Sequence, residues 1–220
     1  MNYKTCIDFS ETCQVLSIQQ ESMTNKESKI LDELSEKSWS ACPDFFNRKF
    51  TLALMDESKN QLQEGLFHAA AIGKLSGQRV KEDVRGDNIL WFDENKLTDL
   101  QTEFMSGMTD FQDILNSEFH LGINEMEFHF AVYPIDSFYK KHLDQFKDKG
   151  NSNRVISCIL YLNDQWLESD GGQLRIHSRD KFTDVFPDGG KFVCFRSEEV
   201  QHEVMPTKKD RHSVTGWMKN

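Results

Sequence analysis

The stretch "MEFHFAVYP", residues 126–134, opens a half of the chain in which short β-strands follow one another closely. Successive side chains of a strand point to opposite faces, so Phe128 and Phe130 would share one face of a sheet. His129 and Tyr133 would share the other. Further segments rich in Phe, Val, Ile and Tyr are RVISCILYLN (154–163), QLRIH (173–177), FTDVFP (182–187), KFVCFR (191–196), HEVMP (202–206) and RHSVTGWM (211–218). Short strands separated by turn residues are typical of a β-sandwich or barrel.

The part of the chain before this β-rich half has apolar residues at helical spacing. We predict helices at residues 27–37, at 53–75 with an end at Gly73, and at 97–116. The sequence therefore predicts an α+β fold in which helices come first and pack on one sheet of a β-sandwich.

The domain organisation follows from the same patterns. Residues 1–38 are polar and are predicted to be an extension with one short helix. Residues 39–220 would form one domain, with its β-core at about 125–218. The stretch "LSGQRVKEDVRGD", residues 75–87, has two glycines and six charges, and it predicts a mobile loop before a short strand.

Composition excludes several classes of partner. A net charge of −10 and a pI near 5.2 argue against a nucleic-acid-binding surface, which needs a basic patch. The five cysteines are odd in number and lack C-x-x-C spacing, which indicates reduced thiols. The N-terminus lacks the pattern of a signal peptide, and no apolar run approaches the roughly 18 residues of a membrane span. We therefore expect a cytoplasmic protein that binds neither nucleic acid nor membrane.

Two residues of "YKKHLDQF", residues 139–146, suggest a metal site. In a strand, His142 and Asp144 would project from the same face and share one ion. Ligands in a jelly roll come from strands far apart in sequence, and His202 is a third candidate downstream. Two imidazoles and one carboxylate occupy one face of an octahedral Fe(II), which is the facial triad of non-haem oxygenases.

Iron enzymes of this kind commonly bind 2-oxoglutarate, whose second carboxylate needs a buried cation. Arg211 follows His202 by nine residues, an interval that holds one strand, a turn and a return strand. A guanidinium suits this task because it offers a bidentate fork and stays charged when desolvated. Ser213 would face the same way as Arg211, and Tyr161 would offer a phenol to the same carboxylate.

In this order, "HLD", "YLN", "GGQLRI", "HEVMP" and "RHSVTGW" resemble the 2-oxoglutarate- and Fe(II)-dependent prolyl 4-hydroxylase family. The resemblance is to its oxygen-sensing branch, the hypoxia-factor prolyl hydroxylases, and to their bacterial relatives. "DVRGDNILWF" and "VYPIDSFYKKHLD" extend it to about residues 80–218. It implies a double-stranded β-helix (jelly roll) core, with His142, Asp144 and His202 as catalytic metal ligands.

The resemblance also implies how the cosubstrate is held. Arg211 would pair with the distal carboxylate of 2-oxoglutarate, and Tyr161 would hydrogen-bond the same group. Tyr133 falls where the family has a tyrosine near the metal-bound end of 2-oxoglutarate. Ser213 stands where serine is common in the wider superfamily.

A substrate rim is implied as well. Trp217 matches an aromatic residue near the substrate mouth. Asp87 is expected to pair with Arg154 beside it, and residues 75–87 are expected to fold over the active site and grip the substrate.

The activity implied by the resemblance is hydroxylation of a prolyl residue in a protein, with consumption of O2 and release of succinate and CO2. Ascorbate would keep the iron reduced, a translation factor is the protein substrate suggested by the bacterial relatives, and a monomer is expected. The same chemistry on a free amino acid, a small metabolite or a lysyl residue is an alternative. An alternative of another class is a non-catalytic jelly-roll binding module, against which the complete ligand set argues.

Overall fold

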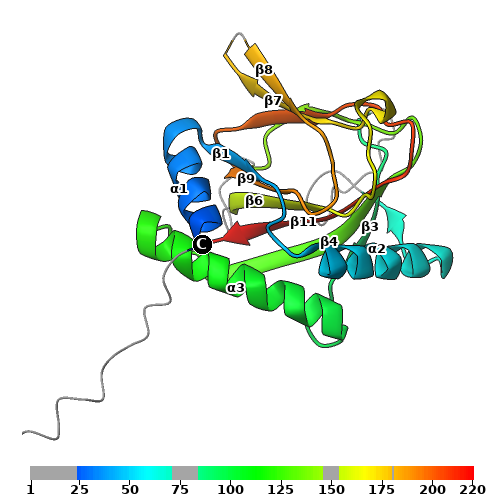
Figure 1. Ribbon diagram of the computed structural model, residues 1–220, viewed down its shortest axis with the longest axis horizontal. Coiled ribbons are helices and arrows are strands. Elements are labelled where there is room, and N and C mark those ends of the chain that lie inside the picture. The colour runs from blue at the N-terminus through cyan, green and yellow to red at the C-terminus, as the bar shows by residue number, and fades with distance from the viewer. Residues whose placement is uncertain (1–23, 71–83, 146–153, 180) are drawn as a thin grey trace, which may run out of the picture.

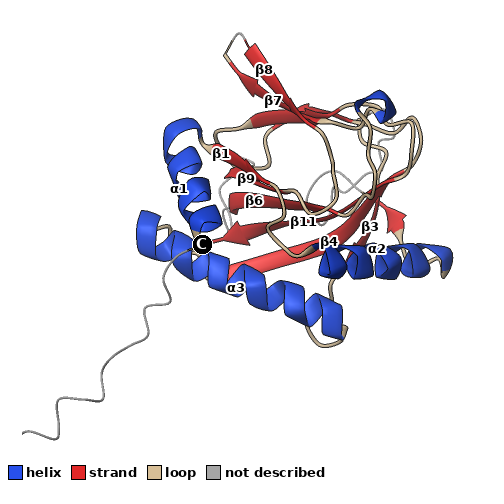
Figure 2. Ribbon diagram, viewed as in Figure 1, coloured by secondary structure: helices blue, strands red, loops and turns tan. Residues whose placement is uncertain are grey.

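The computed structural model describes residues 24–70, 84–145, 154–179 and 181–220. Two β-sheets face each other, and helices cover the outer side of one of them (Figures 1 and 2). The helices are α1 (Asn25–Lys37), α2 (Arg48–Gln63), α3 (Asp99–Phe119) and the short 3-10 helix η1 (Glu168–Asp170). The strands are β1 (Trp39–Cys42), β2 (His68–Ala69), β3 (Asn88–Trp91), β4 (Glu125–Tyr133), β5 (Tyr139–His142), β6 (Arg154–Tyr161), β7 (Leu174–Ser178), β8 (Lys181–Val185), β9 (Phe192–Arg196), β10 (Gln201–Val204) and β11 (Arg211–Lys219).

Both sheets are antiparallel. The larger has the strand order β1-β9-β6-β11-β4-β3-β2, and the smaller has the order β5-β10-β7-β8. From β4 onward the chain alternates between the sheets. Strands β4, β6, β9 and β11 belong to the large sheet, and β5, the β7–β8 hairpin and β10, which come between them, belong to the small sheet. This alternation makes the core a double-stranded β-helix. The predicted α+β fold with a jelly-roll core is confirmed.

The two faces of β4 pack against different parts of the molecule. Phe128 and Phe130 point to the helical side, where the Phe104 ring of α3 packs edge-on against Phe128 at 5.0 Å. Ala131 and Tyr133 belong to a separate buried cluster between the sheets. The predicted alternation is confirmed, and it leaves the inner face of the large sheet free to line a site.

The helices α1 and α3 lie close to their predicted positions. A capping box formed by Thr24 and Glu27 begins α1, whose Ile30, Leu31 and Leu34 are buried in the core. The boundary at residue 38 stays a prediction, although α1 packs on the domain that follows it.

The predicted helix at residues 53–75 is wrong at both ends. Helix α2 begins at Arg48, because the Asn47 side chain accepts a hydrogen bond of 2.9 Å from the Phe50 amide and caps it. It ends at Gln63, and Gly65 adopts a left-handed conformation with φ +73° that stops the helix. The apolar spacing continues past this point, but His68 already belongs to β2.

Part of the predicted loop at residues 75–87 lies outside the described residues, which resume at residue 84. None of the described helices is long and apolar enough to cross a membrane.

Candidate metal centre and its cavity

Three side chains with metal-ligating atoms meet between the two sheets. His142 is the last residue of β5, and His202 lies directly opposite it in the antiparallel register of β10. Asp144 follows β5 by two residues. Its Oδ1 lies 3.3 Å from Nε2 of His142 and 3.8 Å from Nε2 of His202. All three ligand atoms lie within 4.8 Å of one another, so the structure brings the predicted triad together.

Backbone carbonyls orient both imidazoles. Nδ1 of His142 lies 2.7 Å from the carbonyl oxygen of Lys140, and Nδ1 of His202 lies 3.1 Å from that of Val200. A carbonyl only accepts, so each Nδ1 carries the hydrogen and each Nε2 keeps a lone pair for a metal. Burial lowers the pKa of His202 to about 4, although the nearby Asp144 carboxylate opposes this shift. The lowered pKa keeps this imidazole neutral.

A pair of buried serines holds the carboxylate. The Ser157 hydroxyl donates a hydrogen bond of 2.7 Å to Oδ2 of Asp144 and lies 2.8 Å from the Ser197 hydroxyl. Burial raises the pKa of Asp144, but His202, His142 and the Ser157 hydrogen bond outweigh it, and the pKa lies well below its usual range. The carboxylate is therefore ionised, and its Oδ1 is the oxygen that faces the histidines.

Arg211 is a buried cation without an anion. Arg211 is the first residue of β11, and its side chain is 1% exposed. Its Nη2 donates a hydrogen bond of 3.3 Å to the Tyr161 hydroxyl. The guanidinium also lies 5.0 Å from the centre of the Tyr133 ring. Its Nε has no hydrogen-bond partner, and none of the described carboxylates pairs with it. Because an unpaired buried charge is costly, this arrangement suits an anionic ligand.

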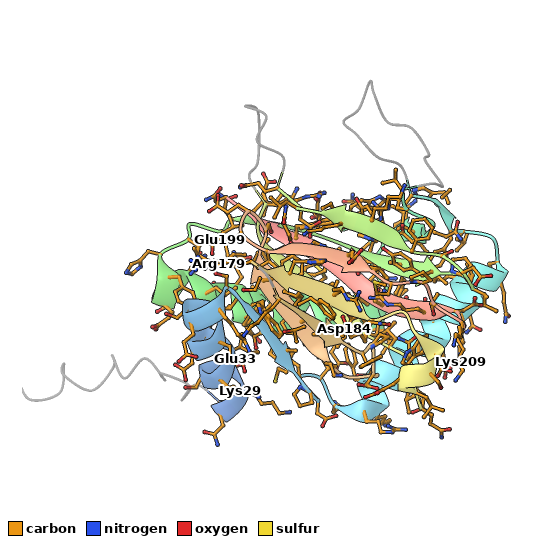
Figure 3. The ribbon with its side chains drawn as sticks, turned by 90° about the horizontal axis from the view of Figure 1, so that it is seen from above. Lys29, Glu33, Arg179, Asp184, Glu199 and Lys209 are labelled. Carbon is orange, nitrogen blue, oxygen red and sulfur yellow. The ribbon has the colours of Figure 1, made fainter. Side chains whose placement is uncertain are left out.

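Two adjacent glycines lie in tight spaces near the site, and one of them, Gly172, borders the Arg211 side chain. A Cβ on Gly172 would lie 3.2 Å from Cδ of Arg211 and 3.0 Å from Oγ1 of Thr207. A Cβ on Gly171 would approach the backbone oxygen of Pro206 to 2.5 Å. The short helix η1 comes directly before these glycines. Lys209 lies on the surface beside it and pairs with Asp170 at its end (Figure 3).

A cavity of about 240 Å³ connects the triad with Arg211. Tyr133 and Trp217 line it, and their contacts with the cosubstrate and the substrate stay predictions. Ser213 is fully buried, and its hydroxyl lies 3.1 Å from that of Thr215. Ser213 therefore has a partner on its own strand.

The predicted ion pair between Asp87 and Arg154 is wrong, although both residues line the cavity. Arg85 holds Asp87 through two hydrogen bonds of 2.7 and 2.5 Å. Arg154 pairs with Glu127 at 3.0 Å and stacks over the Trp217 ring at 3.4 Å. Arg85, two residues away along the chain, satisfies the buried carboxylate of Asp87. Arg154, on β6, instead reaches across the intervening strand β11 to Glu127 on β4.

Sequence reasoning missed the support around the triad. Tyr139 stacks on the His142 ring with centroids 3.7 Å apart, and Ser157 holds Asp144. The alternation of β6 contained a usable signal, because it puts Ser157 on the same face as Tyr161. No local pattern marks Ser197 or Arg85.

Comparison with known proteins agrees with this geometry. Residues 128–219 match the model of the 2OG-Fe(II) oxygenase superfamily. Over 157 residues the chain is 32% identical to prolyl hydroxylase EGLN3 of Homo sapiens and of Mus musculus, which covers 66% of this chain and 64% of those proteins. The chain thus spans less than two thirds of the length of these curated relatives.

Two solved structures share the fold. A Pseudomonas putida prolyl-4-hydroxylase has a TM-score of 0.79 and 34% identity, over 88% of this chain and 98% of that one. A prolyl hydroxylase of Trichoplax adhaerens, in complex with a hypoxia-inducible factor oxygen degradation domain peptide, has a TM-score of 0.77 and 21% identity, over 88% of each chain.

The fold and the triad define a non-haem iron oxygenase. The chain belongs to the 2-oxoglutarate- and Fe(II)-dependent oxygenase superfamily, and within it the chain is similar to prolyl hydroxylases. The donor set fits Fe(II), since two imidazole nitrogens and one carboxylate oxygen leave coordination positions for substrates. When bound, the iron supplies the oxidative chemistry, with 2-oxoglutarate as the cosubstrate of the superfamily. The predicted oxygenase class, Fe(II) and 2-oxoglutarate are confirmed, and the role of ascorbate stays a prediction.

Proposed function

We propose that this enzyme hydroxylates a prolyl residue within a peptide or protein, in a reaction that consumes 2-oxoglutarate and O2 and releases succinate and CO2. The observation that carries the proposal is the shared cavity, which joins the triad to the buried guanidinium of Arg211. Similarity to prolyl hydroxylases along nearly the whole Pseudomonas putida structure supports the choice of acceptor.

Residues at one end of the cavity are proposed to bind the cosubstrate. Arg211 pairs with the distal carboxylate of 2-oxoglutarate, and the Tyr161 hydroxyl, already 3.3 Å from Nη2, donates a second hydrogen bond to it. Tyr133 closes the cavity next to Arg211, opposite it in the register of β4 and β11. This row of side chains excludes water from the anion and orients the cosubstrate toward the triad.

At the other end of the cavity, neighbouring groups fix the orientation of the three metal-ligating side chains. The carbonyls of Lys140 and Val200 hold the two imidazoles, and Ser157 holds the carboxylate. Rigid ligands would hold the metal in one place beside the cavity, into which the acceptor residue enters. Trp217, Asp87 and Arg154 lie around that entrance and are proposed to contact the substrate.

Succinate release and mass spectrometry test the proposal. The purified protein, with Fe(II), 2-oxoglutarate and O2, would be given a capped peptide library with one central proline, and in parallel free proline and a matched library with a central lysine. A gain of one oxygen on the proline of the library peptides is expected, with His142→Ala as the inactive control. Hydroxylation of free proline or lysine alone would contradict it. Absence of iron binding and of succinate would favour a binding module instead.

A further inference from the structure

Three neighbouring strands present an aromatic cluster, which consists of Trp91, His129 and Trp217. Trp91 on β3 lies directly opposite His129 on β4, and His129 lies opposite Thr215 on β11. Trp217 is two residues beyond Thr215 and so shares its face. The ring centroids of His129 lie 4.6 Å from Trp91 and 5.5 Å from Trp217. All three side chains line the same cavity as the metal triad.

The cluster contains two buried polar atoms without partners. His129 is 1% exposed and Trp217 is 7% exposed. Within the part of the chain that the structure describes, Nδ1 of His129 and Nε1 of Trp217 have no hydrogen-bond partner. Burial, together with the nearby charges of Arg85 and Arg154, lowers the pKa of His129 to about 3, so the imidazole is neutral. A buried donor without a partner is costly, and a ligand that supplies the acceptor would recover that cost.

The charges around the cluster are already compensated. Arg85 is bound to Asp87, and Arg154 is bound to Glu127 while it covers the Trp217 ring. A free amino acid carries an ammonium and a carboxylate beside its reacting carbon, and each would need an opposite charge that is not otherwise engaged. The side chains that remain available in the cluster are neutral, flat and capable of hydrogen bonding.

We infer that His129 and Trp217 form a subsite for a backbone amide next to the acceptor residue, with the aromatic rings of the cluster against the plane of that amide. The indole N–H of Trp217 donates to the amide carbonyl, and the neutral imidazole of His129 supplies a second hydrogen bond. The inference rests on the proposed function and deepens it, because it explains how the site selects a residue within a chain over the free amino acid.

The test compares Trp217→Phe and His129→Phe with the wild type. Each substitution keeps an aromatic ring and removes the polar atom. For a peptide selected from the proline library, kcat/KM should fall about tenfold in each variant, mostly through KM, as one hydrogen bond is lost. Binding of Fe(II) and of 2-oxoglutarate, measured directly, should stay within about twofold. Trp39→Phe, on β1 outside the cavity, is the matched control.

Ester analogues of the peptide show whether an amide is the partner. In a set of peptides, one backbone amide beside the proline at a time is replaced by an ester, which is a weaker acceptor and has no N–H. One ester should reduce kcat/KM several-fold in the wild type and have little further effect in Trp217→Phe. If both variants act on every peptide within twofold of the wild type, the subsite is wrong and prolyl hydroxylation stands. If the wild type acts on no peptide, both proposals fall.

Discussion

Ser157 and Asp144 are joined by a hydrogen bond of 2.7 Å, which the serine hydroxyl donates to Oδ2 of the carboxylate. The other oxygen, Oδ1, is the one near the two histidines. Both side chains are buried, and Ser197 lies on the far side of the Ser157 hydroxyl. The bond thus assigns different tasks to the two carboxylate oxygens and favours a carboxylate that binds the metal through one oxygen.

Ser157→Ala should weaken Fe(II) binding by about 10- to 100-fold, the usual effect of losing a partner that orients a ligand. An anaerobic titration with Fe(II), followed through its absorbance with 2-oxoglutarate, measures this affinity. Ser157→Thr keeps the hydroxyl and should restore most of it. Equal affinity in the wild type and Ser157→Ala would show that the carboxylate needs no such support.

Replacement of any triad residue by alanine, at His142, Asp144 or His202, should abolish turnover while the fold persists. The described residues around the site offer no fourth ligand to the cluster. Iron content, succinate release and the circular dichroism spectrum check the three parts of this expectation. Near-normal succinate release from Asp144→Ala would overturn the metal assignment.

Arg211→Ala should reduce the apparent affinity for 2-oxoglutarate by at least ~30-fold. Loss of a buried partner of a carboxylate typically costs ~2–5 kcal/mol, and each ~1.4 kcal/mol is a factor of ten. Arg211→Lys should be intermediate, because a point charge replaces a fork. Arg175→Ala, which breaks an ion pair with Asp184 on the β7–β8 hairpin, is the matched control and should leave the affinity unchanged. Unaltered 2-oxoglutarate dependence in Arg211→Ala would refute the role of Arg211.

His212 should make stability depend on pH. It faces the helical side, where its Nδ1 lies 2.9 Å from the Ser58 hydroxyl of α2, and burial lowers its pKa to about 4. The unfolded chain, in which the histidine has a pKa of ~6.5, binds the proton first as the pH falls. This stability is therefore fully present above about pH 6.5 and is lost as the pH drops toward 4, by up to ~3 kcal/mol.

Urea unfolding of the metal-free protein between pH 4 and 7.5 measures this contribution. His212→Gln should show a shallower loss of the free energy of unfolding toward acid than the wild type. His120→Asn is the control, because His120 is an exposed residue with φ +52° at the end of α3, a conformation that asparagine tolerates. Parallel curves for the wild type and His212→Gln would exclude the assigned contribution.

The alternation around Phe128 and His129 was sufficient to predict the sheet and its two faces, because side-chain direction in a strand depends only on position along the chain. The metal ligands could also be predicted, since the type and order of ligating residues carry the chemistry. The C-terminal end of α2 could not, because its apolar spacing runs on past Gly65 into β2.

Tertiary structure alone decided which partners the polar side chains take. Both Arg85 and Arg154 line the same cavity as Asp87, and in the folded protein Asp87 forms its ion pair with Arg85. The contact of Ser157 with Asp144, and the meeting of His129 with Trp217, depend on register between strands far apart in the sequence. Charge and hydrogen-bond interactions fall off over a few ångströms, so a shift of one residue in register would exchange these partners without any change in the local sequence pattern.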